Sequence, residues 1–257
     1  MKKILLGIKR HWKRFIISLF FGYVTLWALL EPLFAIIDLK FDEYNWIYFI
    51  GYLLISLIIA TINVWPKNKI KLELKNTNTK IEIVFGDLFK QEGSKVISVN
   101  NYFDTEIGKP VSSKSLHGYF IEKIIGGHTE PIENAITEQL QNIKPKKLVK
   151  SEGKTKKCPL GTTIYIDHSS NRYFLFAFSK SDRECKAYSS PTNMLNSLDS
   201  LWDYVRNNGN GHSINLSLIG NGLSGVGLPP TQLIQLILIS ILKFTKSKEL
   251  STTIRIV

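Results

Sequence analysis

Two long apolar segments dominate the first 65 residues and limit what this part of the chain can become. The first is FIISLFFGYVTLWALLEPLFAII, Phe15–Ile37, and the second is WIYFIGYLLISLIIATINVW, Trp46–Trp65. Each has the roughly 20 residues that a helix needs to cross a bilayer. The second also carries tryptophan at both ends, as the interfacial regions of a membrane favour. Residues 38–45 leave room only for a tight turn, so we predict a two-span transmembrane hairpin over residues 15–66.

Basic residues flank this hairpin on one side. Six lysines and arginines precede the first segment, in a basic N-terminus at residues 1–14, and Lys67, Lys69 and Lys71 follow the second. The turn leans acidic, so the positive-inside rule places both termini in the cytoplasm. The protein is expected in the cell inner membrane as a two-span, multi-pass protein. A cleaved signal peptide is the alternative, but the apolar stretch is longer than a signal core, and no small-residue cleavage site precedes Glu31 and Pro32.

Glu31 is a carboxylate inside the first apolar segment, and Pro32 behind it would kink a helix. An ionisable group at membrane depth often marks a pore or a subunit contact. Alternatively, tilt places Glu31 near the outer interface, because it comes late in its segment. The sequence leaves both readings open.

Residues 70–257 alternate strand and helix patterns. β-rich runs bounded by turn residues occupy 80–85, 95–100, 162–167, 172–179, 214–220 and 251–257, and helical candidates occupy 115–125, 132–143, 190–208 and 230–247. Such alternation predicts a three-layer α/β/α domain with a mixed, largely parallel sheet. The last helical candidate is apolar, but it lies between a glycine-rich loop and a strand, so we expect buried core and no third span.

Charge and cysteine content narrow the functional classes. The net charge is +12, and a basic run, KPKKLVKSEGKTKK, occupies residues 144–157. The run lacks interleaved aromatic residues and the chain has no nucleic-acid motif, which favours a solvated loop that could face anionic lipid headgroups over nucleic-acid binding. Cys158 and Cys185 fit no metal-binding spacing, so we expect no metal and a reducing compartment.

Three loops follow predicted strands and should meet in one crevice, because ligands of such sheets bind outside the carboxyl ends of the strands. They are FGDLF (85–89), VNNYFDT (99–105) and IGNGLSGVGL (219–228). Glycines permit positive φ or a close backbone approach, and bare N–H groups at a helix mouth can hold phosphate. A tight turn with nothing bound explains the third loop equally well.

Four stretches, in this order and spacing, resemble the macro domain family, the ADP-ribose-binding α/β/α module. They are GDLF (86–89), KVISVNNYFD (95–104), CPLGTTIYI (158–166) and GNGLSG (220–225), and the resemblance covers about residues 70–257. Together with the two N-terminal spans, the whole chain resembles the ThsA-type membrane-anchored effectors of the Thoeris antiphage system.

The resemblance implies a set of ligand-binding residues. Asp87 would accept a hydrogen bond from the adenine amino group, as a carboxylate can; from the residues alone, it is equally a turn or cap aspartate. Backbone N–H groups of the glycine loop would hold the diphosphate. The implied set on these two loops and at the second strand end is Asp87, Leu88, Asn100, Gly222, Leu223, Ser224, Gly225 and Val226.

The chain departs from the family where hydrolytic macro domains place their distal-ribose and water-positioning groups. Phe103 and Asp104 stand where many members carry a second asparagine, and PVSSKSLHG (110–118) replaces a triple-glycine loop. These changes put ADP-ribosyl hydrolysis in doubt and suggest an altered distal pocket. Its candidate residues are Asp104, Ser112, Ser113, Ser115 and His117; a helix-start role without ligand contact is the alternative for His117.

The resemblance therefore implies a sensor with no catalytic residues and no cofactor. Its ligand would be an ADP-ribose derivative made by a TIR-domain enzyme, and its response would be homo-oligomerisation, membrane disruption and abortive infection. The alternatives are a membrane-tethered ADP-ribosyl hydrolase and a passive reader of ADP-ribosylated partners. No nucleic-acid partner is expected.

Overall fold

The structure is a computed structural model that describes residues 2–36, 45–74, 77–144, 146–147, 150–223, 225–246 and 250–257. Contacts divide the chain into two compact units, Met1–Asn68 and Lys69–Val257. Each unit is described by itself.

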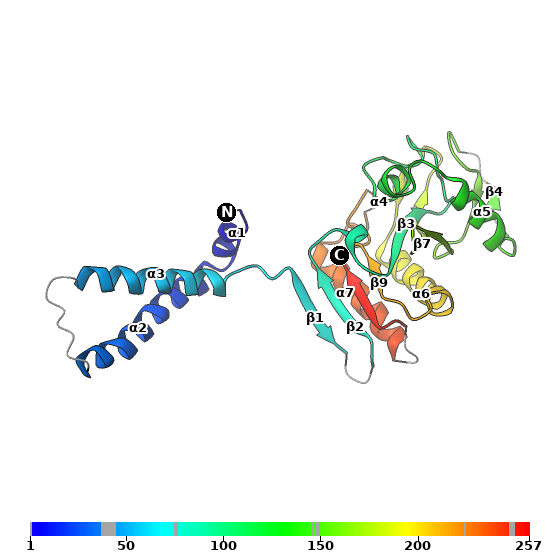
Figure 1. Ribbon diagram of the computed structural model, residues 1–257. Helices are drawn as coiled ribbons and strands as arrows, with labels where there is room; N and C mark the ends of the chain where they lie inside the picture. The colour runs from blue at the N-terminus through cyan, green and yellow to red at the C-terminus, as the bar shows by residue number, and fades with distance from the viewer. Residues whose placement is uncertain are drawn as a thin grey trace. The chain divides into compact units, whose positions relative to one another are not determined.

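The N-terminal unit consists of α1 (Lys2–Arg10), α2 (Trp12–Ile36) and α3 (Asn45–Asn63). Helices α2 and α3 lie against each other (Figure 1), with Gly22 opposite Ser56 and with Asn63 Nδ2 donating to Ser18 Oγ. Small residues and interhelical hydrogen bonds of this kind let helices approach closely in an apolar medium. The expected helices are thus present, whereas the expected turn lies almost entirely outside the described residues.

Two of these helices qualify as candidate membrane spans by length and composition. They are Trp12–Pro32, with a mean hydropathy of 1.6, and Trp46–Asn63, with a mean hydropathy of 1.9. The basic N-terminus, for which no helix was predicted, forms α1.

The C-terminal unit is built on a mixed sheet in the order β1-β2-β10-β9-β3-β7-β6, with β8 paired to β7. Its central strands β2, β10, β9, β3 and β7 are mutually parallel, and the edge strands β1 and β6 are antiparallel. The prediction of a mixed, largely parallel sheet is confirmed. The strands are β1 (Lys69–Glu73), β2 (Lys80–Val84), β3 (Ser94–Asn100), β6 (Thr163–His168), β7 (Asn171–Ser181), β8 (Ala187–Tyr188), β9 (Ile214–Leu216) and β10 (Thr253–Ile256), and a separate hairpin joins β4 (Lys146–Lys147) to β5 (Lys156–Lys157).

Helices cover both faces of this sheet, because its central strands are apolar on both sides. In β7, Phe174, Phe176 and Phe178 pack into the core beneath α6 (Pro191–Asn208) and α7 (Pro230–Thr245). The alternate residues of β7 join a second core. That core lies beneath α4 (Leu116–Tyr119), the π-helical turn η2 (Phe120–Ile124) and α5 (Glu130–Gln139). The expected three layers are therefore present.

Helix α7 is a core element, as expected. Leu233, Ile237 and Ile241 are fully buried on its inner face, and Ser240 accepts a hydrogen bond from Trp202 Nε1 of α6 at 2.7 Å. Two predicted elements differ in detail. The helix expected over 115–125 is the short α4 followed by η2, and the strand expected over 214–220 ends at Leu216, where the chain turns toward the glycine loop.

Candidate ligand-binding pocket

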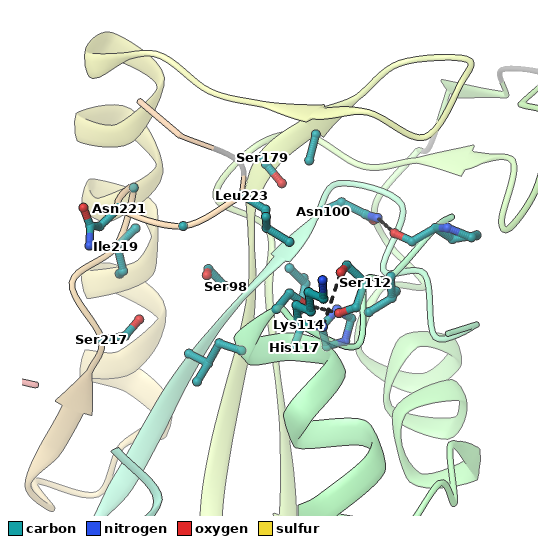
Figure 2. Close-up of a pocket in the computed structure, with 18 of the residues that line it drawn as sticks. Ser98, Asn100, Ser112, Lys114, His117, Ser179, Ser217, Ile219, Asn221 and Leu223 are labelled. Carbon is teal, nitrogen blue, oxygen red and sulfur yellow. Dashed lines mark hydrogen bonds between the residues drawn. The ribbon is translucent and has the colours of Figure 1, made fainter. Parts of the chain in front are cut away.

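A pocket of about 830 Å³ opens at the carboxyl ends of the parallel strands (Figure 2). Asn100 ends β3, Ser179 lies near the end of β7, and Ser217 and Val257 directly follow β9 and β10. Parallel strands end at one edge of the sheet, so their loops meet there. Two of the three predicted loops, 99–105 and 219–228, contribute to the lining; residues 85–89 do not.

The glycine loop forms one wall through residues 219–223. Position 220 requires glycine, because its φ is +87° and a Cβ there would lie 2.7 Å from Val226 Cγ2. Gly222 does not need it for folding, because its φ is ordinary and a Cβ would meet no atom of the described residues within 4 Å. A side chain at Gly222 would therefore border the pocket without straining the loop.

The remaining glycine-loop candidates fall elsewhere. Leu223 lines the pocket and is largely exposed, whereas Val226 is buried in the core beneath α7. Gly225 is absent from the lining, and Ser224 lies outside the described residues.

The opposite wall runs from Lys109 to His117 and ends in α4. Ser115 caps this helix: its Oγ accepts from Gly118 N at 2.9 Å and donates to Ser112 O at 2.6 Å. Ser112 and Ser115 both line the pocket, while Ser113 does not. Serine is well suited to this capping role because its short hydroxyl reaches the free N–H groups of the first turn.

His117 lies at the base of this wall, beside Ser112 and Lys114 in Figure 2. It is 5% exposed, and its buried Nε2 has no hydrogen-bond partner within the part of the chain that the structure describes. Burial, and then the charge of Lys154, lower the pKa of His117 from 6.5 to about 3. The imidazole is therefore neutral at physiological pH, and its unpaired nitrogen is a polar group that a ligand could satisfy.

The charged side chains of the lining are all basic. Lys109, Lys114 and Lys186 contribute to it, and no aspartate or glutamate is among the described lining residues. Lys109 pairs with Glu152 at 3.0 Å outside the lining. An electropositive concavity concentrates anions, so the pocket is suited to a negatively charged ligand.

A buried polar network supports the pocket beneath Asn100. The Asn100 side chain donates to Asp104 Oδ2 at 2.9 Å and to Pro110 O at 3.3 Å, and its oxygen accepts from Tyr102 N at 3.1 Å. Asp104 is ion-paired with Lys150, and both side chains are fully buried. Asp104 Oδ1 also accepts from Lys154 N at 2.6 Å.

This network corrects two expectations. The basic run 144–157 is not simply a solvated loop, because Lys150 is buried to compensate the Asp104 charge. Asp104 is absent from the lining, and its oxygens are already occupied within the protein. Asn100 reaches the pocket, but its amide is engaged in positioning the chain.

Asp87 follows β2 at the same edge of the sheet, but outside the lining. Its Oδ1 accepts from Phe89 N at 2.9 Å and so caps the 3₁₀ turn η1 (Leu88–Lys90). The side chain is exposed, whereas Leu88 is buried in the core beneath α4 and α5. The structure thus shows the capping role that the residues alone allowed.

Several lining residues were not predicted from the sequence. Ser179 and Ser217 lie near or just beyond strand ends, where ligands of such sheets bind, but no motif around either residue marks it. Lys109 and Lys186 had no local signal, because their place at the pocket depends on how distant loops fold back. Among the described residues, no group of three or more His, Cys, Asp or Glu is placed to hold a metal ion.

Comparison with known proteins identifies the family. Residues 81–257 match the family described as Thoeris protein ThsA, Macro domain. The chain is 30% identical over 183 residues to "Thoeris protein ThsA" of Bacillus amyloliquefaciens (strain Y2), covering 68% of this chain. It spans only 59% of the length of that relative.

Solved macro domains are similar at low identity. The Oceanobacillus iheyensis macrodomain with ADP has 14% identity and a TM-score of 0.47, over 74% of this chain and 87% of that one. The macrodomain of Mycobacterium tuberculosis DarG has 15% identity and a TM-score of 0.43, over 66% of this chain and 93% of that one. The family match covers more than half of the chain, and this protein therefore belongs to the family of Thoeris ThsA macro-domain proteins.

Proposed function

We propose that the pocket binds an ADP-ribose-type nucleotide as the signal of an antiphage defence response. The observation that carries this proposal is the lining itself, in which lysines and serines surround the carboxyl ends of parallel strands and no aspartate or glutamate is among the described lining residues. A volume of about 830 Å³ falls in the range of small-molecule pockets. Membership of the ThsA macro-domain family supports the same ligand class.

Within this proposal, the glycine loop and α4 hold opposite ends of the ligand. Residues 219–223 present a backbone wall to which a diphosphate can come close, because Gly222 has no side chain. Ser112, Ser115 and His117 face the ligand from the other side. This arrangement keeps the family's diphosphate site and changes the distal end.

Sensing is favoured over hydrolysis by the chemistry of the same lining. General-base catalysis works best with a group whose pKa lies near the operating pH. His117, with a pKa of about 3, is a poor base at neutral pH, and the described lining supplies no aspartate or glutamate in its place. We therefore propose a non-enzymatic receptor.

The response would occur in the membrane. The two candidate spans anchor the chain, a TIR-domain enzyme supplies the nucleotide, and the liganded receptors assemble into homo-oligomers that disrupt the bilayer. A ligand can drive such a transition only by binding the assembled state more tightly than the resting one.

The decisive test is to identify the nucleotide that the protein binds. Mass spectrometry of material retained by the purified protein, followed by calorimetry with that nucleotide and with ADP-ribose, should show binding without turnover. Turnover would favour a membrane-tethered hydrolase. Binding without ligand-dependent assembly would favour a passive reader of ADP-ribosylated partners.

The glycine wall offers a matched genetic test. Gly222→Glu adds bulk and negative charge where the ligand is proposed to carry phosphate, and the open surroundings of Gly222 should leave folding intact. Coexpressed with an active TIR enzyme, this variant should lose both binding and toxicity while keeping its expression level. If cells that express the variant still die, the glycine loop is not part of the ligand-binding site.

Membrane topology is a separate part of the proposal. The basic flanks predict that both termini are cytoplasmic. Reporters fused after Val257 and inserted within residues 39–44 should report opposite sides of the membrane. The same side for both would exclude the hairpin.

A further inference from the structure

Helix α1 lies against the end of α3 and presents an uneven surface. A Cβ at Gly7 would overlap the carbonyl oxygen of Val64 and lie 3.3 Å from Pro66 Cδ, so α1 approaches α3 closely at this point. Ile4 and Ile8 are half-buried, while Leu5 and Leu6 are 63% and 57% exposed. A nine-residue helix is therefore held beside the hairpin with two large apolar side chains uncovered.

Basic residues crowd the same end of the hairpin. Lys9 and Arg10 are exposed in the last turn of α1, and Lys13 and Arg14 are exposed in the first turn of α2. None of these four takes part in an ion pair among the described residues. The sequence contains no aspartate or glutamate before Glu31, so no carboxylate close to them along the chain balances them.

Two exposed tryptophans lie at this end as well. Trp12 begins α2 and is 55% exposed, and Trp65 follows α3 and is 50% exposed. Tryptophan favours the level of the headgroups, where its ring is buried and its N–H stays wet. These rings mark the level of the bilayer surface beside α1.

We propose that α1 lies in the plane of the membrane surface and binds anionic phospholipid headgroups. Leu5 and Leu6 share the exposed side of α1 with Lys9 and Arg10 at i,i+4 spacing. The leucines enter the acyl boundary, and the long side chains of Lys9, Arg10, Lys13 and Arg14 extend to the headgroup phosphates. Charge complementarity selects an anionic lipid surface over a second copy of this chain, whose corresponding end carries the same positive charge. The inference rests on the proposed membrane anchoring.

A fluorescent label on α1 tests the proposal directly. Leu5→Cys would be labelled with the environment-sensitive dye NBD in the full chain; Cys158 and Cys185 are buried, and the unsubstituted chain reports any labelling of them. The labelled protein is reconstituted into phosphatidylcholine vesicles with and without phosphatidylglycerol. We expect blue-shifted, brighter emission only with phosphatidylglycerol, and the shift should decrease as salt is added.

Charge removal then identifies the contacts. A basic residue near an anionic surface contributes about 1 kcal/mol, so Lys9→Gln with Arg10→Gln should lower the docked-to-undocked ratio roughly 30-fold. Lys13→Gln with Arg14→Gln provides a second pair should the first alter α1. Lys146→Gln with Lys147→Gln removes the same charge from the exposed β4 and should have no effect.

Three results would overturn the proposal. Emission that is equal in both vesicles and insensitive to the double substitutions would mean that α1 does not bind anionic lipid. Emission that follows the protein-to-lipid ratio and ignores phosphatidylglycerol would mean that a second copy covers the helix. A chain that fails to insert into either vesicle would remove the membrane anchor along with this inference.

Discussion

The two walls of the pocket differ in how many buried contacts support them. The wall at residues 219–223 is a glycine loop with Leu223 exposed and open space around Gly222, whereas the wall at residues 109–117 rests on fully buried charged and polar side chains. Asn100 and Asp104 connect that second wall to Lys150, which is distant in sequence. The difference indicates that buried contacts preform the wall at residues 109–117, whereas the wall at residues 219–223 presents open backbone to the pocket.

Removing the Lys150 charge should have the largest effect. Lys150→Met leaves Asp104 buried without its cation, and breaking a buried pair on one side costs about 3–5 kcal/mol of unfolding free energy. Urea denaturation measures the loss. Lys146→Met, at an exposed site, is the matched control, and adding Asp104→Asn to Lys150→Met should recover part of the stability. A cost below about 1 kcal/mol would mean that the wall does not depend on the pair.

Substitutions at two positions of the glycine loop should distinguish an effect on folding from an effect on binding. Gly220→Ala forces a side chain to adopt positive φ and to overlap Val226, which should cost roughly 2–4 kcal/mol. Gly222→Ala should change stability by less than about 0.5 kcal/mol and should weaken nucleotide binding. Thermal unfolding and calorimetry on the two variants supply the comparison. Equal destabilisation by both substitutions would show that the loop is more tightly packed than it is in this structure.

Acid should weaken the preformed wall through His117. Its pKa is lowered to about 3 in the folded state, whereas the unfolded chain takes up the proton near the ordinary value of 6.5. The stabilising effect of high pH is therefore lost as the pH falls below about 6.5. Between pH 7 and pH 5 the folded state should lose about 2 kcal/mol, at 1.36 kcal/mol for each pH unit below 6.5.

The His117 effect is checked by denaturation at the two pH values. His117→Asn should lack this part of the pH dependence. If the variant and the unsubstituted protein lose the same stability between pH 7 and pH 5, the burial of the imidazole is not the cause.

A smaller loss of stability than that from His117 is expected at Asp87, which belongs to neither wall. Asp87→Ala removes the cap on Phe89 N and should cost about 1 kcal/mol, whereas Asp87→Ser keeps a capping hydroxyl. If the nucleotide extends along the sheet edge toward β2, both variants should bind it more weakly because both lack the carboxylate. If calorimetry shows that Asp87→Ser binds the nucleotide with full affinity, the role of Asp87 is capping alone.

Much of the architecture was predictable because it depends on local pattern. Alternating strand and helix periods indicated the three layers and the largely parallel sheet, and apolar length indicated α2 and α3. The rule that ligands bind at strand ends then located the crevice. Glycine enrichment pointed to a loop that lines the pocket, but not to the role of each glycine: position 220 requires glycine for its backbone conformation, whereas Gly222 borders the pocket without such a requirement.

The sequence by itself thus determined the order of the elements, the positive charge of the chain, the candidate spans and, through its motifs, the resemblance to macro domains. Only the tertiary structure decided that Asp104 is a buried partner of Lys150, that Asp87 caps a turn outside the lining, and that Lys109 and Lys186 border the pocket. The physical reason is that burial and ion pairing depend on contacts between residues far apart in the chain. Asp104 and Lys150 are 46 positions apart, and nothing in the local pattern around either residue indicates the other.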